Sequence, residues 1–116
     1  MSAEAFFEVL KLALMPKRAV FRKRVTFAFA VLDGGAFVLD TQAPELIEKG
    51  YRSGCDVSIL CNTLTLREIA LGRFDPDAPR PHHFFRWGGD REALAILSRA
   101  LSGGRSMLAV RAQSTP

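Results

Sequence analysis

The chain of 116 residues contains little of what several common protein functions require. It has two cysteines, two histidines and one tryptophan, and no apolar run approaches the roughly twenty residues of a membrane-spanning helix. It has no P-loop, no dinucleotide-binding glycine pattern, no zinc-type cysteine spacing and no G-x-S-x-G turn around a nucleophilic serine. These absences argue against the usual nucleotide-binding proteins, zinc proteins and serine hydrolases.

The few cysteines and histidines form no pattern typical of a reactive site. Cys55 and Cys61 flank a strand-like run, and on one extended strand, at roughly 3.3 Å per residue, they lie too far apart for a disulfide. We expect reduced thiols in a cytoplasmic protein, since no basic region precedes the N-terminal apolar stretch as in a secretory signal.

His82 and His83 are adjacent, and neighbouring side chains on a strand point to opposite faces. A pair in a surface loop is therefore favoured over a metal or catalytic role.

Apolar residues, by contrast, are abundant, at 48% of the chain with nine phenylalanines. That is enough for the core of a single domain. The first apolar stretch predicts a helix over residues 3–15, capped by Ser2 and ended by Pro16. Its apolar residues cover most of the helix surface, so we expect it to be buried on several sides or to contact something apolar.

A basic segment follows this helix in a chain whose formal net charge is +4. Its cationic residues are Lys17, Arg18, Arg22, Lys23 and Arg24. The segment is interpreted either as a solvated connection or as a surface for an anionic membrane. No nucleic-acid-binding motif accompanies it, so we expect no nucleic-acid partner.

The middle of the chain has the period-two pattern of strands. Apolar bulk alternates with small residues over 25–31, Asp33-Gly34 is a turn signal, and residues 36–40 form the returning strand of a hairpin. A further strand is expected over 56–62. Residues 42–54 are ambiguous: they fit a short helix opened by Pro44, or an edge strand within 46–51.

Two helices are expected in the second half. Thr65 and Glu68 fit a capping box that starts one helix, and Gly72 ends it. A short strand over 84–87 follows, and Asp90 caps a helix over 91–102. The order of helix, hairpin, ambiguous segment, strand, helix, strand and helix predicts an α+β fold with helices over one face of a sheet.

These motifs, in this order and spacing, resemble the signature of the sterol carrier protein 2 family. The matching residues are Asp56 at a strand start, Gly72-Arg73-Phe74-Asp75-Pro76, Phe84-Phe85-Arg86-Trp87 and Gly89-Asp90. The hairpin from Phe27 to Gly35 is also similar to that family. The resemblance covers roughly residues 25–102.

The resemblance implies a five-stranded, mainly antiparallel sheet covered by helices, with an apolar cavity between sheet and helices. It also implies a short strand within 46–51. The domain plan is then an apolar helix and basic segment over 1–24, a lipid-binding domain over 25–102 and a tail over 103–116, together one globular unit. The implied function is non-catalytic binding or carriage of a fatty acid, acyl-CoA, sterol or other isoprenoid.

We expect the cavity between the sheet and the helices at 66–71 and 91–102. Residues spaced i, i+3 and i+7 share a helix side, and alternate residues share a strand face. The expected lining is Leu66, Ile69, Phe74, Phe85, Trp87, Leu94, Leu97 and Leu101. Trp87, as the single tryptophan, is expected to report on a bound ligand. No catalytic residue, metal or cofactor is expected.

Two alternatives remain open at the level of sequence. The protein could present an apolar intermediate to enzymes of a lipid or isoprenoid-quinone pathway, with a biosynthetic enzyme or a second copy of itself as partner. It could also be a small enzyme that uses Asp75, His82 or His83 as acid or base. The second alternative is disfavoured because no nucleophile–base pair is evident.

Overall fold

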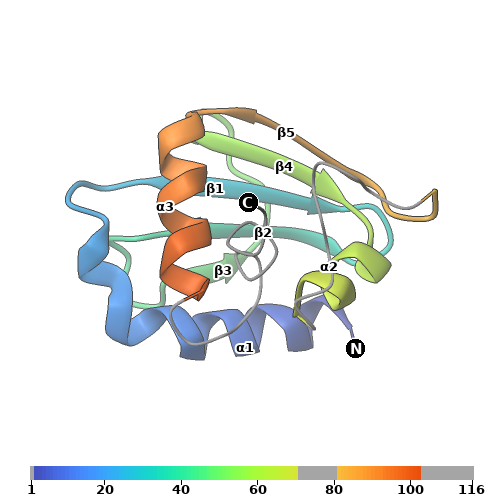
Figure 1. Cartoon of the computed structure of the whole chain (residues 1–116), viewed down its shortest axis with the longest axis horizontal. Helices are drawn as coiled ribbons and strands as arrows, with labels where there is room; N and C mark the ends of the chain where they lie inside the picture. Colours follow the sequence, from blue (N-terminus) through green and yellow to red (C-terminus); the bar gives the residue numbers. More distant parts are fainter. Residues whose placement is uncertain (1, 71–80, 103–116) are drawn as a thin grey trace, which may run out of the picture.

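The chain forms one five-stranded sheet with its helices packed over one face (Figure 1). The computed structural model describes residues 2–70 and 81–102. Its elements are α1 (Ala3–Leu14), the 3-10 helix η1 (Met15–Val20), β1 (Thr26–Val31), β2 (Gly35–Asp40), β3 (Ile47–Lys49), β4 (Val57–Cys61), α2 (Thr63–Ala70), β5 (Phe85–Gly89) and α3 (Arg91–Ser102).

The sheet order is β3-β2-β1-β4-β5, with β1 at the centre. β1 pairs antiparallel with β2 and parallel with β4, while β2–β3 and β4–β5 are antiparallel. The predicted α+β fold with a mainly antiparallel five-stranded sheet is confirmed. The ambiguous segment contains the short edge strand β3 rather than a helix.

The predicted hairpin is also confirmed, although its glycines act differently from the expectation. The N–H of Gly34 donates to the carbonyl of Val31 at 3.0 Å, which closes the turn. The positive φ falls on Gly35, at +94°. Gly34 instead allows close packing against α1, because a Cβ there would lie 2.6 Å from Cβ of Ala3.

β1 has one face of bulky residues and one of small residues, as the alternation in its sequence predicts. Phe27, Phe29 and Val31 are buried under the helices. Phe7 of α1 contacts this layer: its ring lies 5.0 Å from that of Phe29 and 4.2 Å from that of Phe37. Burial of these rings supplies much of the hydrophobic stabilisation that holds α1 on the sheet.

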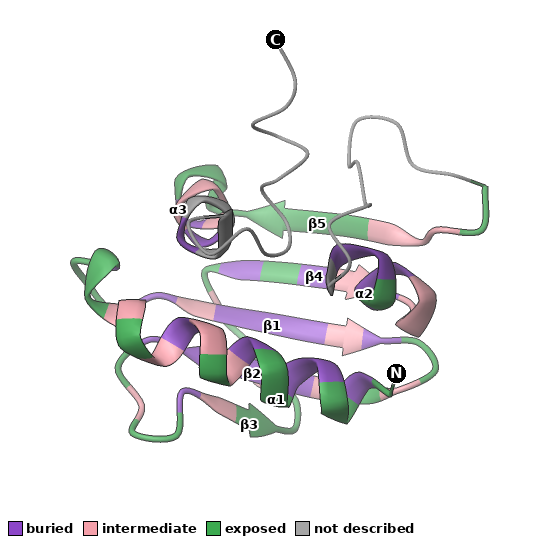
Figure 2. Cartoon of the chain, turned by 60° about the horizontal axis from the view of Figure 1, so that its bottom comes forward, coloured by how far each residue is buried: buried purple, intermediate pink, exposed green. Residues whose placement is uncertain are grey.

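The first helix begins as predicted but is less buried than expected. Ser2 Oγ accepts a hydrogen bond from the N–H of Ala5 at 3.1 Å. α1 ends at Leu14, and the chain continues directly as η1 with Pro16 in its first turn, so the proline changes the helix type rather than ending the helical segment. The outer side remains exposed (Figure 2). No helix within the described residues is long and apolar enough to cross a membrane.

The second helix begins at Thr63, and its cap lies three residues before the predicted one. Asn62, not Thr65, is the cap: its Oδ1 accepts from the N–H of Thr65 at 2.9 Å. Thr65 is buried inside the first turn, and its hydroxyl accepts from the N–H of Phe84 at 3.0 Å. Thr65 therefore connects α2 to the start of β5, a tertiary role that the local sequence pattern does not reveal.

The last helix is capped by Asp90, as predicted. Oδ1 of Asp90 accepts from the N–H groups of Glu92 at 2.9 Å and Ala93 at 3.2 Å. The N–H of Asp90 donates to the carbonyl of Asp56 at 2.9 Å. This bond fixes the start of α3 against the start of β4, and it depends on the sharp turn at Gly89, whose φ is +109°.

Candidate functional site

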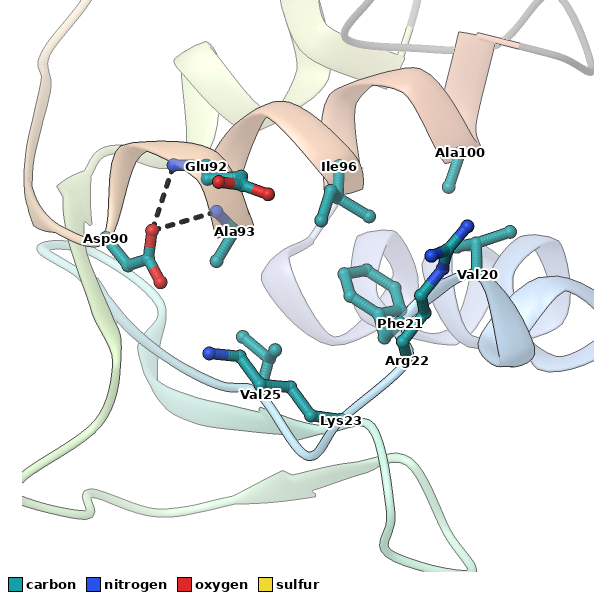
Figure 3. A pocket seen from close by; sticks show the side chains of 10 residues that line it. All are labelled: Val20, Phe21, Arg22, Lys23, Val25, Asp90, Glu92, Ala93, Ile96 and Ala100. Atoms are coloured by element: carbon teal, nitrogen blue, oxygen red, sulfur yellow. Dashed lines mark hydrogen bonds between the residues drawn. The ribbon is translucent and has the colours of Figure 1, made fainter.

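A groove of about 640 Å³ lies between α3 and the segment that leads from η1 into β1 (Figure 3). Its volume falls within the range of small-molecule sites, roughly 300–1,000 Å³. The residues that line it are Val20, Phe21, Arg22, Lys23, Val25, Asp90, Glu92, Ala93, Ile96 and Ala100. Figure 3 shows Ile96 and Phe21 directed toward each other across this space.

The groove has an apolar interior and a charged rim. Phe21, Val25 and Ala93 are buried, and Ile96 is half-buried. Arg22, Lys23, Asp90 and Glu92 are exposed on the rim, two cations and two carboxylates. Such a surface suits an amphiphile whose alkyl part contacts the interior while its polar head lies among the charged side chains of the rim.

Basic residues close to the groove divide into two groups. Arg18 donates to the carbonyl of Thr41, at 2.9 Å from its Nη2, and Arg24 binds both carboxylate oxygens of Asp40. Lys17 donates to the carbonyl of Ala100 at 3.0 Å. These three side chains therefore hold the connection between η1 and β1 in place, and the remaining two cations of the segment stand at the groove.

A second space, smaller and less open to solvent than the groove, lies on the other side of α3, and we call it the enclosed cavity. It measures about 30 Å³, close to the volume of one water molecule in the liquid. Its apolar lining consists of Phe6, Leu10, Phe29, Ile59, Cys61, Leu66, Ile69, Phe85, Leu94 and Leu97. The expected cavity between sheet and helices thus exists here only as a small void.

The enclosed cavity brings together five of the eight residues expected to line a lipid site, namely Leu66, Ile69, Phe85, Leu94 and Leu97. Phe74 and the side chain of Leu101 lie outside the described residues. Trp87 is placed apart from this group.

Trp87 is 38% exposed and lines a separate hollow of about 310 Å³, together with Tyr51 and Arg86. β5 is an edge strand, and exposure along it rises from half-buried Phe85 to exposed Trp87. Sharing a strand face therefore did not place the two rings in one cavity. Trp87 therefore does not line the enclosed cavity, and its use as a reporter of a bound ligand stays a prediction.

The groove residues were missed by sequence reasoning, although a signal for them exists. Ala93, Ile96 and Ala100 repeat at i, i+3 and i+7, which is one side of α3, while Leu94 and Leu97 occupy the neighbouring side. Two neighbouring apolar sides on one helix indicate that each side faces its own apolar space. α3 therefore separates the groove from the enclosed cavity.

The two histidines differ in their surroundings, contrary to the expected surface pair. His82 is exposed, whereas the side chain of His83 is 2% exposed, with Nε2 3.9 Å from Oε1 of Glu68. Within residues 2–70 and 81–102, no group of three or more His, Cys, Asp or Glu side chains is arranged to hold a metal ion. Asp75, the other proposed acid or base, lies outside the described residues.

The two thiols are expected to react at very different rates. Burial, with a smaller contribution from Asp33, raises the pKa of Cys61 to about 12, so at pH 8 only about one molecule in 10,000 carries its thiolate. Cys55 is half-buried. A disulfide exchange reagent should titrate one thiol in the native protein and two in denaturant, and Cys55→Ser should remove the native signal. Two reactive thiols in the folded protein would contradict this burial.

No protein-family model and no curated protein sequence matches the chain. Solved structures that share its fold include the stereoselective inverting sec-alkylsulfatase Pisa1 from Pseudomonas sp., with a TM-score of 0.64 and 19% identity over 84% of this chain and 16% of that chain. A double mutant of the same sulfatase gives a TM-score of 0.63 at 18% identity. Palmitated SCP2L2 from Aedes aegypti gives 0.63 at 17% identity, over 86% of this chain and 95% of that chain.

These comparisons differ in how much of the other protein is matched. The chain spans about 16% of the length of the sulfatase, but nearly all of SCP2L2. At these identities the likeness concerns the fold. The sheet order, the helices over one face and the match along nearly the whole of SCP2L2 agree with the resemblance drawn from the sequence: the chain has the fold of a sterol carrier protein 2-like domain.

Proposed function

We propose that the protein binds and carries, without catalysis, an apolar lipid that has an anionic head group. The observation that carries this proposal is the groove between α3 and residues 20–25, which has an apolar interior and a rim that bears Arg22 and Lys23 as well as Asp90 and Glu92. Support from the fold comes from SCP2L2, a structural neighbour described as palmitated.

The apolar interior offers enough driving force for such a ligand. Burying a sixteen-carbon chain at about 0.8 kcal/mol per methylene contributes roughly 13 kcal/mol before the costs of association. Those costs reduce the net affinity to the micromolar range. Because affinity of this order allows release as well as uptake, it suits carriage better than permanent storage.

The head group is proposed to lie near Arg22 and Lys23. A carboxylate or sulfate there forms charge-assisted hydrogen bonds, which are stronger than those between neutral groups. The enclosed cavity on the other side of α3 is proposed as a second binding position for the alkyl chain of the ligand. An outward shift of α3 would join the two spaces and let Leu94 and Leu97 contact the ligand.

Carriage rather than chemistry is proposed because the thiol near the apolar space is unsuited to catalysis. Cys61 lines the enclosed cavity, and its pKa of about 12 keeps it protonated at neutral pH. A nucleophile needs a lowered pKa or an adjacent base. Both cysteines are free thiols, which supports a reducing, cytoplasmic location.

Two tryptophan substitutions on neighbouring sides of α3 test the groove. Ile96→Trp should fill the open groove, reduce palmitate affinity at least about tenfold and leave the protein folded. Leu97→Trp enters a buried site beside a cavity of about 30 Å³, and overpacking should destabilise the fold by roughly 1–3 kcal/mol. Calorimetric titration with palmitate and thermal unfolding separate these effects. Full affinity in Ile96→Trp would reject the groove as the site.

The same titration tests the head group. Arg22→Gln combined with Lys23→Gln should weaken dodecanoate binding about tenfold and leave dodecanol binding unchanged, since the alcohol has no charge to lose. Arg67→Gln combined with Arg86→Gln removes the same charge from exposed positions outside the groove and serves as the control. Equal losses for acid and alcohol would contradict the proposed role of the two cations.

A further inference from the structure

The two edges of the sheet differ in how well they are protected against pairing with another chain. The edge strand β3 has three residues, and two of them, Glu48 and Lys49, are charged. The edge strand β5 has five residues, and Arg86 is its one charged residue. Short edge strands and charged side chains are devices by which natural proteins prevent edge-to-edge pairing. β5 is thus the less protected edge, and it lies at the upper margin of the sheet in Figure 1.

The main-chain groups of Trp87 point toward the outer edge of β5. The N–H of Asp90 donates to the carbonyl of Asp56 at 2.9 Å, and hydrogen-bonded and non-hydrogen-bonded pairs alternate along an antiparallel ladder. Trp87, three residues before Asp90, therefore belongs to a non-hydrogen-bonded pair with β4. Cys61 agrees with this alternation, because its carbonyl accepts from the N–H of Leu32 at 2.9 Å, on the side of β1 rather than β5.

Trp87 combines an available main chain with an exposed ring. Within residues 2–70 and 81–102, no group forms a hydrogen bond with the N–H or the carbonyl of Trp87 at this edge, and the residue is 38% exposed. Tryptophan supplies a large apolar area together with an N–H donor, which suits it to protein interfaces. An exposed ring beside unpaired main-chain groups indicates a strand that pairs with another strand.

We propose that β5 pairs antiparallel with β5 of a second copy of the chain, about a twofold axis that passes between the two Trp87 residues. Twofold dimers are the commonest oligomers, because one surface patch that complements itself completes the assembly. In this register the two Trp87 main chains exchange both hydrogen bonds, as the residues of a hydrogen-bonded pair do. A second copy alone therefore completes the edge.

The side chains of β5 fit this register. Each Arg86 comes to lie opposite Gly88 of the second copy, and each Phe85 opposite Gly89. Bulky side chains therefore face each other only at the central pair of tryptophans. An aromatic ring can cover a glycine on a neighbouring strand, which compensates for the packing that glycine lacks. An extended peptide of unrelated sequence would not match this alternation.

The two neighbouring symmetric registers are less favourable. An axis through Arg86 would place the two guanidinium groups directly opposite each other, which is destabilising. An axis through Gly88 would place Arg86 opposite Asp90, which has left the strand to cap α3, and would pair fewer residues within β5. Charge and strand length therefore select the register centred on Trp87.

This pairing does not depend on the proposed lipid site. In the described part of the chain, no residue of β5 lines the groove between α3 and residues 20–25. Loss of the dimer should therefore leave palmitate binding unchanged, and loss of palmitate binding should leave the dimer unchanged. The two proposals can fail separately.

Cysteine cross-linking tests the register directly. The Cα atoms of a hydrogen-bonded antiparallel pair lie about 5.5 Å apart, within the roughly 4.4–6.8 Å that a disulfide spans. In a Cys55→Ser background, Trp87→Cys should form a disulfide-linked dimer with diamide at least about tenfold faster than Gly88→Cys, whose two copies stand diagonally about 7–8 Å apart. Gly88 accepts a side chain, since no heavy atom lies within 4 Å of an added Cβ. Non-reducing electrophoresis measures both rates.

Sedimentation velocity measures the dimer without cross-links. The wild type should show a monomer–dimer equilibrium, and Trp87→Lys should raise its dissociation constant at least about tenfold, because two like charges would stand directly opposite each other. Leu12→Lys adds the same charge at a position on α1 that is 75% exposed and serves as the control. Arg86→Gln should change the constant less than about threefold, because Arg86 faces a glycine.

Four results would overturn this proposal. Equal cross-linking of Trp87→Cys and Gly88→Cys would reflect random collisions, and equal weakening by Trp87→Lys and Leu12→Lys would place the interface elsewhere. A tighter dimer in Arg86→Gln would favour the axis through Arg86. A wild type that is monomeric at every concentration, with no cross-link in Trp87→Cys, would reject the pairing itself. Circular dichroism of the cysteine variants ensures that unfolding is not the cause of a missing cross-link.

Discussion

Gly89→Ala is expected to destabilise the protein by roughly 3–5 kcal/mol, which is exceptional for the addition of one methyl group. Gly89 has a φ of +109°, a conformation that alanine adopts only under strain. A Cβ there would also overlap the carbonyl oxygen of Asp56. That oxygen accepts the N–H of Asp90, so relief of the overlap would displace the cap of α3.

Gly88 provides the control for this change. It lies beside Gly89, and no heavy atom falls within 4 Å of a Cβ added there. Gly88→Ala should therefore leave the midpoint of denaturant unfolding nearly unchanged, while Gly89→Ala should shift it strongly. Equal midpoints for the two variants would mean that the turn from β5 into α3 tolerates a side chain, and would weaken its role in positioning the groove.

Asp40→Asn is expected to cost roughly 2 kcal/mol at neutral pH. The buried carboxylate of Asp40 accepts hydrogen bonds from Arg24 at 2.7 Å and from Arg52 at 3.1 Å. Together with the N–H of Gln42, these donors lower the pKa of Asp40 from 3.8 to about 2, with Arg24 as the largest cause. Both arginines are partly exposed, so salt will reduce the effect.

The lowered pKa of Asp40 fixes the pH range in which this stability is lost. The folded state holds the ionised carboxylate more strongly than the unfolded chain does, so the contribution is complete above about pH 4 and disappears as the pH falls toward about 2. Asp40→Asn should flatten this part of the stability curve. Glu45→Gln, which breaks an exposed pair with Lys11, is the control and should leave it in place. Parallel curves for wild type and Asp40→Asn would contradict the assignment.

Short-range patterns predicted much of the fold correctly. The hairpin follows from the alternation in β1 and a glycine turn, and the cap of α3 follows from Asp90 at its start. Both depend on residues within a few positions of each other, where spacing fixes the geometry. The edge strand β3 was ambiguous because only three of its residues pair, too few for a period-two pattern to be clear.

Tertiary contacts explain what the sequence could not predict. Thr65 fits a capping box as well as Asn62 fits a cap, and the contact with Phe84 from β5 shows why Thr65 is inside the helix. The basic segment appeared uniform, yet the carbonyl of Thr41 and the carboxylate of Asp40 bind two of its arginines. No local pattern shows which cations have partners far away in the chain.

The residues of the enclosed cavity were largely predicted and those of the groove were not, again because tertiary contacts decide the difference. Leu94 and Leu97 were expected to face an apolar space, and they do, but its volume depends on how closely α1, α2 and the sheet approach each other. The groove depends on Phe21 and Ile96, which lie far apart in sequence and meet only in the folded chain. Helix periodicity identifies an apolar side, but it does not say whether that side meets a packed core or an open groove.

The parallel pairing of β1 with β4 separates folding into an early step and a later one. β1 and β2 are adjacent in the chain and can pair within microseconds, whereas β1 and β4 join residues about 30 positions apart, as Thr26 and Asp56 are, and must first close that loop. On the ribosome, α1 and the hairpin emerge before β4, so Phe7 can cover Phe29 and Phe37 before β4 is free to pair. β5 and α3 are synthesised afterwards. α3, which completes the groove, is therefore added to a sheet whose aromatic face is already covered by α1 and protected from aggregation.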